Sequence, residues 1–167
     1  MGIGALEITH KRMSDLTKAE VSVLRKLVVT FPNHENFSRF ELWLWHWRVQ
    51  KSVWVAIIEI NCDIIGWAAV ALGEGWKTGL AGVYVHPKYR GRYFARYVLF
   101  SLFAHCANTP EIKQRLDYIR YQENKEKLFR PLFEYWGFKD GFQYHEEQKA
   151  RESAAQAEIK NSLDEAK

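Results

Sequence analysis

Apolar runs predict a set of β-strands in the first half of the chain. The segments Ser52–Ile60 and Ile64–Leu72 are rich in β-branched and apolar residues, which favour strands. Between them, Asn61–Asp63 supplies residue types that favour a tight turn. The pattern therefore predicts an antiparallel hairpin, followed by a loop and a third strand at Leu80–Val85. A further short strand is expected at Ala5–Thr9.

Apolar residues at helical spacing predict helices before and after these strands. Thr17 and Glu20 have the spacing of a capping box, in which each side chain satisfies a first-turn N–H group. The apolar positions that follow are Val21, Leu24, Leu27 and Val28. A second helix is expected over Arg39–Gln50, and a strongly apolar one over Tyr93–Ala107.

The C-terminal part alternates strand and helix patterns. Leu116–Tyr121 is predicted as a strand, and the segment after it is predicted to be mostly helical as far as Trp136. Pro131 either starts a new helical piece or kinks the helix. Gly137 then ends it, and Phe142–His145 is expected to form a last strand.

The order β-α-α-β-β-β-α-β-α-β places antiparallel strands first and crossover helices later. This order predicts one α/β domain with a mixed sheet. The 167-residue chain suits one well-buried domain, which we assign to residues 1–145. Residues 146–167 carry few large apolar side chains and are expected to be a solvated helix or a disordered tail.

Composition and sequence patterns narrow the classes of protein to which this chain could belong. A hydrophobic content of 47% favours a packed core, and a net charge of +4 is only mildly basic. No run is long enough to cross a membrane, no signal-peptide pattern is present, and no metal-ligand spacing occurs, so a cytoplasmic protein is expected. Cys62 and Cys106 are expected to be small core residues rather than a disulfide. Only Lys88–Arg96 is locally basic, so binding to nucleic acid is not favoured.

The segment Val83–Ala95 carries the clearest chemistry. A short apolar strand runs into a basic loop, and the loop opens into the apolar helix. Unpaired N–H groups and the helix dipole favour an anion at a helix N-terminus. Positive charge from Lys88, Arg90 and Arg92 adds to this, and Gly91 allows close approach of a ligand. The segment therefore predicts a site for a phosphorylated ligand.

This segment resembles the acyl-CoA loop of the GCN5-related N-acetyltransferase (GNAT) superfamily. That loop follows a Val-x-Pro-like step and reads Arg/Gln-x-x-Gly-x-Gly/Ala, and here Arg90 and Ala95 occupy its first and last places. The central glycine of the motif is replaced by Tyr93. Further segments that resemble the family are Asp63–Gly66, Asn124 after a strand, and Leu132–Phe138. Together they extend the resemblance over most of residues 5–145 and imply a GNAT-like acyl-CoA N-acyltransferase fold.

The resemblance also implies roles for individual residues. Main-chain groups of Val83 and Val85 would pair with the pantetheine arm of acetyl-CoA, and N–H groups of residues 90–95 would hold its pyrophosphate. The full set of implied cofactor-binding residues is Val83, Val85, Lys88, Arg90, Gly91, Arg92, Tyr93, Phe94, Ala95, Asn124 and Phe133.

The general acid and base are less clear in the sequence. Phe133 stands where the family often has the tyrosine that protonates the departing thiolate. Tyr135 is close in sequence, but two helical steps turn it away, so it is expected to be a packing residue. A water chain, a substrate group or Glu59 could accept the proton of the amine.

Several aromatic and imidazole residues allow two interpretations. If the loop needs a left-handed backbone at position 93, a tyrosine there is sterically costly. If position 93 lies in the first helical turn, a tyrosine is acceptable. The alternating Trp43, Trp45 and Trp47 either pack in the core and rim or face an acceptor or a protein partner, and Trp76 is similar. Neither His86 nor His105 is expected to act as a catalyst.

The function that the resemblance implies is transfer of an acetyl group from acetyl-CoA to an amine acceptor, by direct attack in a ternary complex. Its alternative is a protein that keeps the fold with little or no activity and serves as a protein-binding module. The replacements at Tyr93 and Phe133 favour this alternative.

Overall fold

The structure is a computed structural model that describes residues 4–29, 52–73, 77–121 and 125–166. Within these residues one sheet runs in the order β1-β2-β3-β4-β5-β6. The first four strands are antiparallel, and β5 and β6 are added in parallel, as the sequence predicted. The strands are β1 (Leu6–Arg12), β2 (Val53–Ile60), β3 (Asp63–Leu72), β4 (Thr78–Val85), β5 (Tyr118–Tyr121) and β6 (Lys139–Asp140).

The predicted hairpin is present with its turn. Asn61 and Cys62 have φ angles of 51° and 68°, which explains why the turn needs residue types that tolerate a left-handed backbone. Cys62 is exposed there, so its assignment to the core was wrong, whereas Cys106 is buried.

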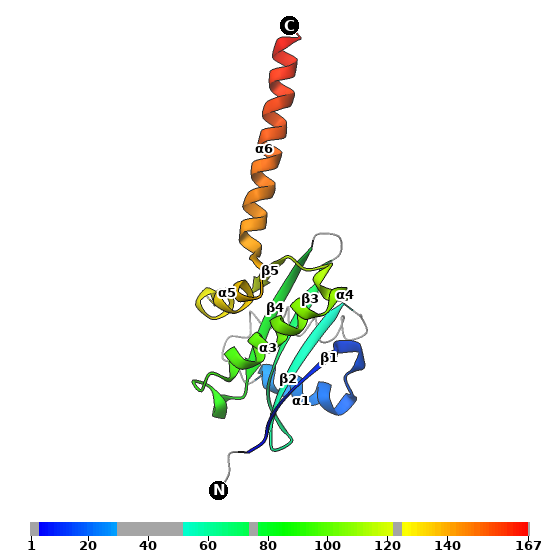
Figure 1. Ribbon diagram of the computed structural model, residues 1–167, viewed down its shortest axis with the longest axis vertical. Coiled ribbons are helices and arrows are strands. Elements are labelled where there is room, and N and C mark those ends of the chain that lie inside the picture. The colour runs from blue at the N-terminus through cyan, green and yellow to red at the C-terminus, as the bar shows by residue number, and fades with distance from the viewer. Residues whose placement is uncertain (1–3, 30–51, 74–76, 122–124, 167) are drawn as a thin grey trace.

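Alternate residues of the central strands build two separate cores. On one face, Ala68 and Val70 of β3 pack with Val83 of β4 against the helices α3 (Phe94–Asn108) and α5 (Glu126–Tyr135). On the other face, Trp67 of β3 and Tyr84 of β4 pack near α1 (Lys18–Val29). Figure 1 shows α3 lying across the sheet. Among the described residues, helices therefore pack against both faces of the sheet.

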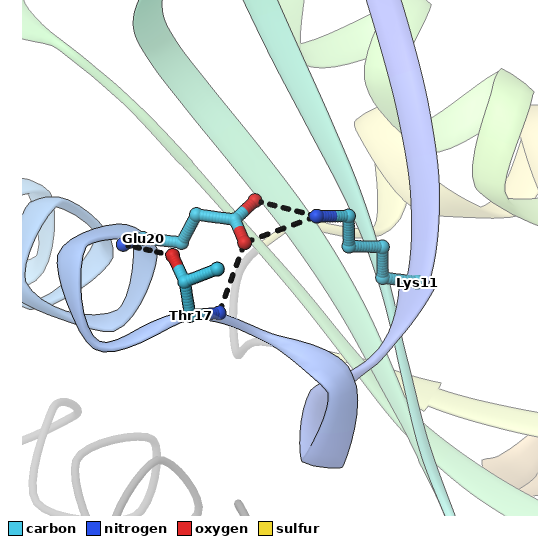
Figure 2. A network of polar contacts seen from close by, with 3 residues as sticks. All are labelled: Lys11, Thr17 and Glu20. Carbon is cyan, nitrogen blue, oxygen red and sulfur yellow. Dashed lines mark hydrogen bonds and ion pairs between the residues drawn. The ribbon is translucent and has the colours of Figure 1, made fainter.

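The capping box at the start of α1 forms as predicted. The backbone N–H of Glu20 donates to Thr17 Oγ1 at 3.1 Å, and the N–H of Thr17 donates to Glu20 Oε1 at 3.0 Å. Lys11 of β1 adds an ion pair to the same carboxylate at 3.0 Å (Figure 2). Burial raises the pKa of Glu20, but the hydrogen bonds from Thr17 and Lys11 outweigh it, so the pKa is lowered overall.

The last predicted strand is wrong. Phe142 lies in the first turn of α6 (Gly141–Glu165), and the strand before it is the two-residue β6. Asp140 explains the change, because its side chain accepts a hydrogen bond from the N–H of Phe142 at 2.8 Å and caps the helix. Pro131 lies inside α5 rather than at its start, and Gly137, with φ of 90°, follows the end of that helix.

Asp140 also ties three elements together. Its carboxylate is buried, accepts a hydrogen bond from the Tyr121 hydroxyl of β5 at 2.9 Å and lies 3.3 Å from Arg130 Nε of α5. Burial, followed by the nearby carboxylate, raises the pKa of Tyr121. The phenol therefore stays protonated and donates.

Two histidines join the edge strand β1 to α3. The rings of His10 and His105 stack with centroids 4.5 Å apart, and His10 Nε2 lies 2.9 Å from Ser101 Oγ. Burial lowers the pKa of both imidazoles, and for His10 the charge of His105 lowers it further. His105 is therefore a packing residue, as expected.

The predicted helix Arg39–Gln50, with Trp43, Trp45 and Trp47, lies outside the described residues, as do Trp76 and Asn124. Within the described part of the chain, no helix combines the length and the apolar character that a membrane crossing requires.

Loss of the capping hydroxyl should destabilise α1. We expect Thr17→Ala to lower the free energy of unfolding by about 1 kcal/mol, because a first-turn N–H loses its acceptor. Urea denaturation measures this, and Ser14→Ala, on the exposed turn before α1, is the control. Equal stability of the two variants would contradict the assignment of the cap.

The stacked histidines should make the fold acid-sensitive. Their pKa values are lowered in the folded state, so the unfolded chain binds more protons below the ordinary histidine pKa of 6.5. We expect full stability above that pH and a progressive loss below it. In denaturation at a series of pH values, His105→Phe should lose less stability on acidification than the parent chain. Identical pH profiles would show that the pair does not couple folding to pH.

Candidate active site

The end of β4 forms the first part of the site. β4 pairs with β3 along most of its length, from Gly79 with Leu72 to Val85 with Gly66. On its other side it pairs with β5 only from Thr78 to Ala81. Among the described residues, Gly82–Val85 therefore has no strand neighbour on the β5 side, and we call this side the open edge.

Hydrogen bonding shows which main-chain groups face the open edge. The N–H of His86 donates to the Ile65 carbonyl of β3 at 2.7 Å, whereas the Lys77 carbonyl accepts from Tyr118 at the start of β5 at 3.0 Å. Because main-chain groups alternate along a strand, odd-numbered residues of β4 point toward β5. Val83 and Val85 therefore present their N–H and C=O groups to the open edge, while their side chains are buried.

The basic loop begins immediately after this edge. Pro87–Tyr89 forms a short 3-10 turn, and His86 Nδ1 accepts from the N–H of Lys88 at 3.1 Å. Arg90 folds back, and its Nε donates to the Val85 carbonyl at 3.0 Å. One of the main-chain groups at the open edge is thus already hydrogen-bonded to a side chain of the loop.

The backbone favours glycine at one position of this loop. Gly91 has φ of 77°, and a methyl group in place of its hydrogen would meet no atom within 4 Å. The left-handed backbone favours glycine there, and the surrounding space is open to a ligand.

Tyr93 has the left-handed backbone rather than that of a first helical turn, which is the costlier of the two expected conformations. It precedes α3 with φ of 65° and ψ of 7°, a left-handed conformation, and supplies no capping side chain. Its ring is 66% exposed and lies 5.3 Å below the Arg96 guanidinium. Phe94 and Ala95 are half-buried in the first turn of α3.

The electrostatics of the loop favour an anion. The side chains of Lys88, Arg90 and Arg92 are exposed, and no acidic residue occurs between Glu74 and Glu111 in the sequence. Their charges add to the positive end of α3. An extended main-chain edge thus leads directly to a positively charged helix terminus, an arrangement that suits a long ligand with an amide-containing arm and phosphates.

The α5 residues considered for the site face different surroundings. Phe133 is fully buried, with its ring 5.9 Å from those of Phe103 and Tyr121. Tyr135 is 71% exposed and its ring lies 5.2 Å from that of Phe100, so it packs against other aromatic rings at the surface rather than in the core. The structure places the Phe133 ring in the core beside β5.

The remaining candidate, Glu59, lies near the hairpin turn. It is half-buried on β2, opposite Glu7 of β1 and beside a bulge in the pairing with β3. Within the described residues, no group of three His, Cys, Asp or Glu side chains could hold a metal ion.

Sequence reasoning assigned no position to Tyr84, the aromatic residue of β4 that pairs with Trp67 of β3. Tyr84 lies between Val83 and Val85 but points to the opposite face, where its ring is fully buried 5.0 Å from that of Trp67. Side chains alternate between the two faces of a strand, and this rule would have predicted that Tyr84 points to the face opposite Val83 and Val85. The Arg90–Val85 hydrogen bond was also missed, because no local pattern encodes it.

Comparison with solved structures places this architecture among acetyltransferases. One similar structure is a putative GNAT-family acetyltransferase from Desulfovibrio desulfuricans, at 14% identity and a TM-score of 0.53 over 78% of this chain and 83% of that one. Another is a predicted acetyltransferase with acetyl-CoA from Clostridium acetobutylicum, at 20% identity and a TM-score of 0.50 over 81% and 91% of the two chains.

A third is an aminoglycoside N-acetyltransferase, AAC(6')-Iy, in complex with CoA, at 13% identity and a TM-score of 0.51 over 82% of this chain and 90% of that one. No curated protein sequence matches the chain. Identities this low establish the fold alone.

The sheet that opens beside β4 and the basic loop that follows define an acyltransferase fold. The sequence model of the Acetyltransferase (GNAT) family matches residues 21–138. The chain therefore belongs to the GNAT family, as the sequence motifs implied.

The left-handed backbone at Tyr93 leads to a stability prediction. We expect Tyr93→Gly to raise the free energy of unfolding by about 1 kcal/mol, because glycine adopts this conformation without steric cost. Tyr97→Gly, inside α3, should instead lower it by about 1 kcal/mol. Thermal denaturation of both variants measures the difference, and a destabilised Tyr93→Gly variant would show that the Arg96 contact outweighs the strain.

Proposed function

We propose that the protein transfers an acetyl group from acetyl-CoA to an amine acceptor. The observation that carries this proposal is the open edge of β4, which leads directly into an arginine-rich loop and the N-terminus of α3. Of the neighbours with a similar fold, a predicted acetyltransferase is described with acetyl-CoA and an aminoglycoside N-acetyltransferase with CoA, which supports the choice of cofactor.

In this proposal the cofactor adds to the sheet like a short strand. Main-chain groups of Val83 and Val85 bind the amides of the pantetheine arm, and Asn124, outside the described residues, contacts the same arm. The Val85 carbonyl must then exchange its bond with Arg90 for one with the ligand. The released Arg90 joins Arg92 and the N–H groups of residues 90–95 at the pyrophosphate.

The reaction is a direct transfer. The neutral amine attacks the thioester carbonyl carbon, a C–N bond forms, and the C–S bond breaks as the thiolate leaves. A covalent intermediate on cysteine is not favoured, since burial raises the pKa of the Cys106 thiol to about 12 and Cys62 lies at the hairpin turn. The proton of the amine passes to water, to a substrate group or to Glu59.

We propose that positioning supplies most of the rate. Phe133 has no proton to donate and its ring is closed into the core. A thiolate leaves without strong assistance, so holding the amine and the thioester together is the larger contribution. Tyr135, which is exposed, remains the only tyrosine of α5 and the alternative proton donor.

Reversal of charge in the loop should weaken cofactor binding. We expect Arg90→Glu together with Arg92→Glu to weaken acetyl-CoA binding at least about tenfold in calorimetry, because two phosphate-binding cations become anions. Arg92→Glu alone retains the Arg90–Val85 bond and should give part of the effect. Lys18→Glu together with Lys26→Glu, both exposed on α1, is the control with the same change in charge. Unchanged affinity in the loop variant would remove the loop from the cofactor site.

Release of free thiol separates an enzyme from the alternative, a binding module with the same fold. The proposal expects thiol release from acetyl-CoA in the presence of a set of amines, beyond the rate of hydrolysis. Tight acetyl-CoA binding without release in any amine would favour the binding module.

A further inference from the structure

The C-terminal helix α6 extends far beyond the domain. Every residue from Lys149 to Ala166 is exposed, and Figure 1 shows the helix projecting away from the sheet. A single helix without tertiary contacts is only marginally stable in water. An exposed helix of this length therefore favours a partner that covers part of it.

One face of its distal half is apolar. Ala155, Ile159, Leu163 and Ala166 are spaced so that they share a face of the helix. Ile159 and Leu163 are each 62% exposed and lie one helical turn apart, so they form a continuous apolar pair on that face. We call residues 152–166 the distal tail. Its charged residues are Glu152, Glu158, Lys160, Asp164 and Glu165, so the tail is acidic overall.

A second exposed apolar surface lies on the body of the protein. Tyr97 and Phe100 are three positions apart on α3, so they share a face of the helix, with exposures of 57% and 37%. Phe100 contacts Tyr135 and Trp136 at the end of α5, with ring centroids 5.2 and 5.3 Å away. We call Tyr97, Phe100, Tyr135 and Trp136 the aromatic patch. Contiguous exposed aromatic surface of this kind marks an interaction site.

The charges around the two surfaces are complementary. On α3 the aromatic patch is bordered by Arg96, in a stretch of sequence without any acidic residue between Glu74 and Glu111. On α5 it is bordered by Glu134, whose charge is paired with Arg130 at 3.0 Å. The distal tail carries four acidic residues and one lysine. Apolar contact with a charged border of opposite sign gives both affinity and orientation.

We propose that the distal tail docks on the aromatic patch of a second copy of this chain, in a reciprocal dimer. Within one chain the contact would require α6 to bend back, whereas Figure 1 shows it extending away from the end of α3 that carries the loop. In a two-fold dimer each tail covers the partner's patch, so the contact forms twice and its buried area doubles. Ile159 and Leu163 insert among the rings, and the tail acids pair with Arg96.

Sedimentation equilibrium of the full chain tests the proposal. The parent chain should dimerise with a dissociation constant of about micromolar order. Ile159→Glu with Leu163→Glu should raise that constant at least about 100-fold, because both apolar anchors are lost. Ala157→Glu with Asn161→Glu is the matched control, since it adds the same charges at the same spacing on the opposite face of α6. A monomeric parent chain, or equal effects of the two variants, would overturn the proposal.

A mixing experiment identifies the surface that the tail binds. Tyr97→Glu with Tyr135→Glu changes exposed residues of the patch and should also give monomers. When the tail variant and the patch variant are mixed, one intact tail meets one intact patch, so a weaker heterodimer should form. A patch variant that dimerises like the parent chain, or a mixture that stays monomeric, would show that tails pair with each other or elsewhere. The readout is assembly without acetyl-CoA, so it is independent of the proposed catalytic function.

Discussion

The early end of the parallel ladder between β4 and β5 is the constraint on which the rest of the site depends. The ladder joins Thr78–Ala81 to Tyr118–Tyr121 and goes no further among the described residues, while the antiparallel ladder with β3 continues to Val85. Near Val85, β4 is thus paired with β3 on one side and lacks a strand partner on the β5 side. Unsatisfied main-chain groups are costly when they are shielded from water, so an edge of this kind favours an occupant that brings donors and acceptors.

In the protein without cofactor, a side chain of the basic loop donates a hydrogen bond to this edge. Arg90 donates to the Val85 carbonyl, and the left-handed residues Gly91 and Tyr93 turn the chain from the strand into α3. Strain at a non-glycine residue persists only where the surroundings hold it, and here α3 is held by its buried face against the sheet. The geometry of the anion site is therefore a product of core packing as well as of the local motif.

Sequence patterns predicted the elements whose signals are local. The apolar runs of β2 and β3, the turn at Asn61 and the capping box at Thr17 each depend on residues close in sequence, and all were confirmed. Phe142–His145 was wrong because an aromatic run resembles a strand, whereas Asp140 caps a helix there. The burial of Phe133, the exposure of Tyr135 and the Arg90 contact depend on tertiary packing, which spacing alone does not encode.

The connectivity of the sheet also sets the order in which its parts can assemble. β2, β3 and β4 follow one another through short connections, so their pairing closes small loops and costs little chain entropy. The pairing of β4 with β5 must wait until the chain has passed through α3, and β1 must meet β2 across residues 13–52. Non-local pairing of this kind closes a longer loop and costs more chain entropy. The open edge thus lies at the boundary between a meander of short connections and a strand that reaches the sheet only through a crossover helix.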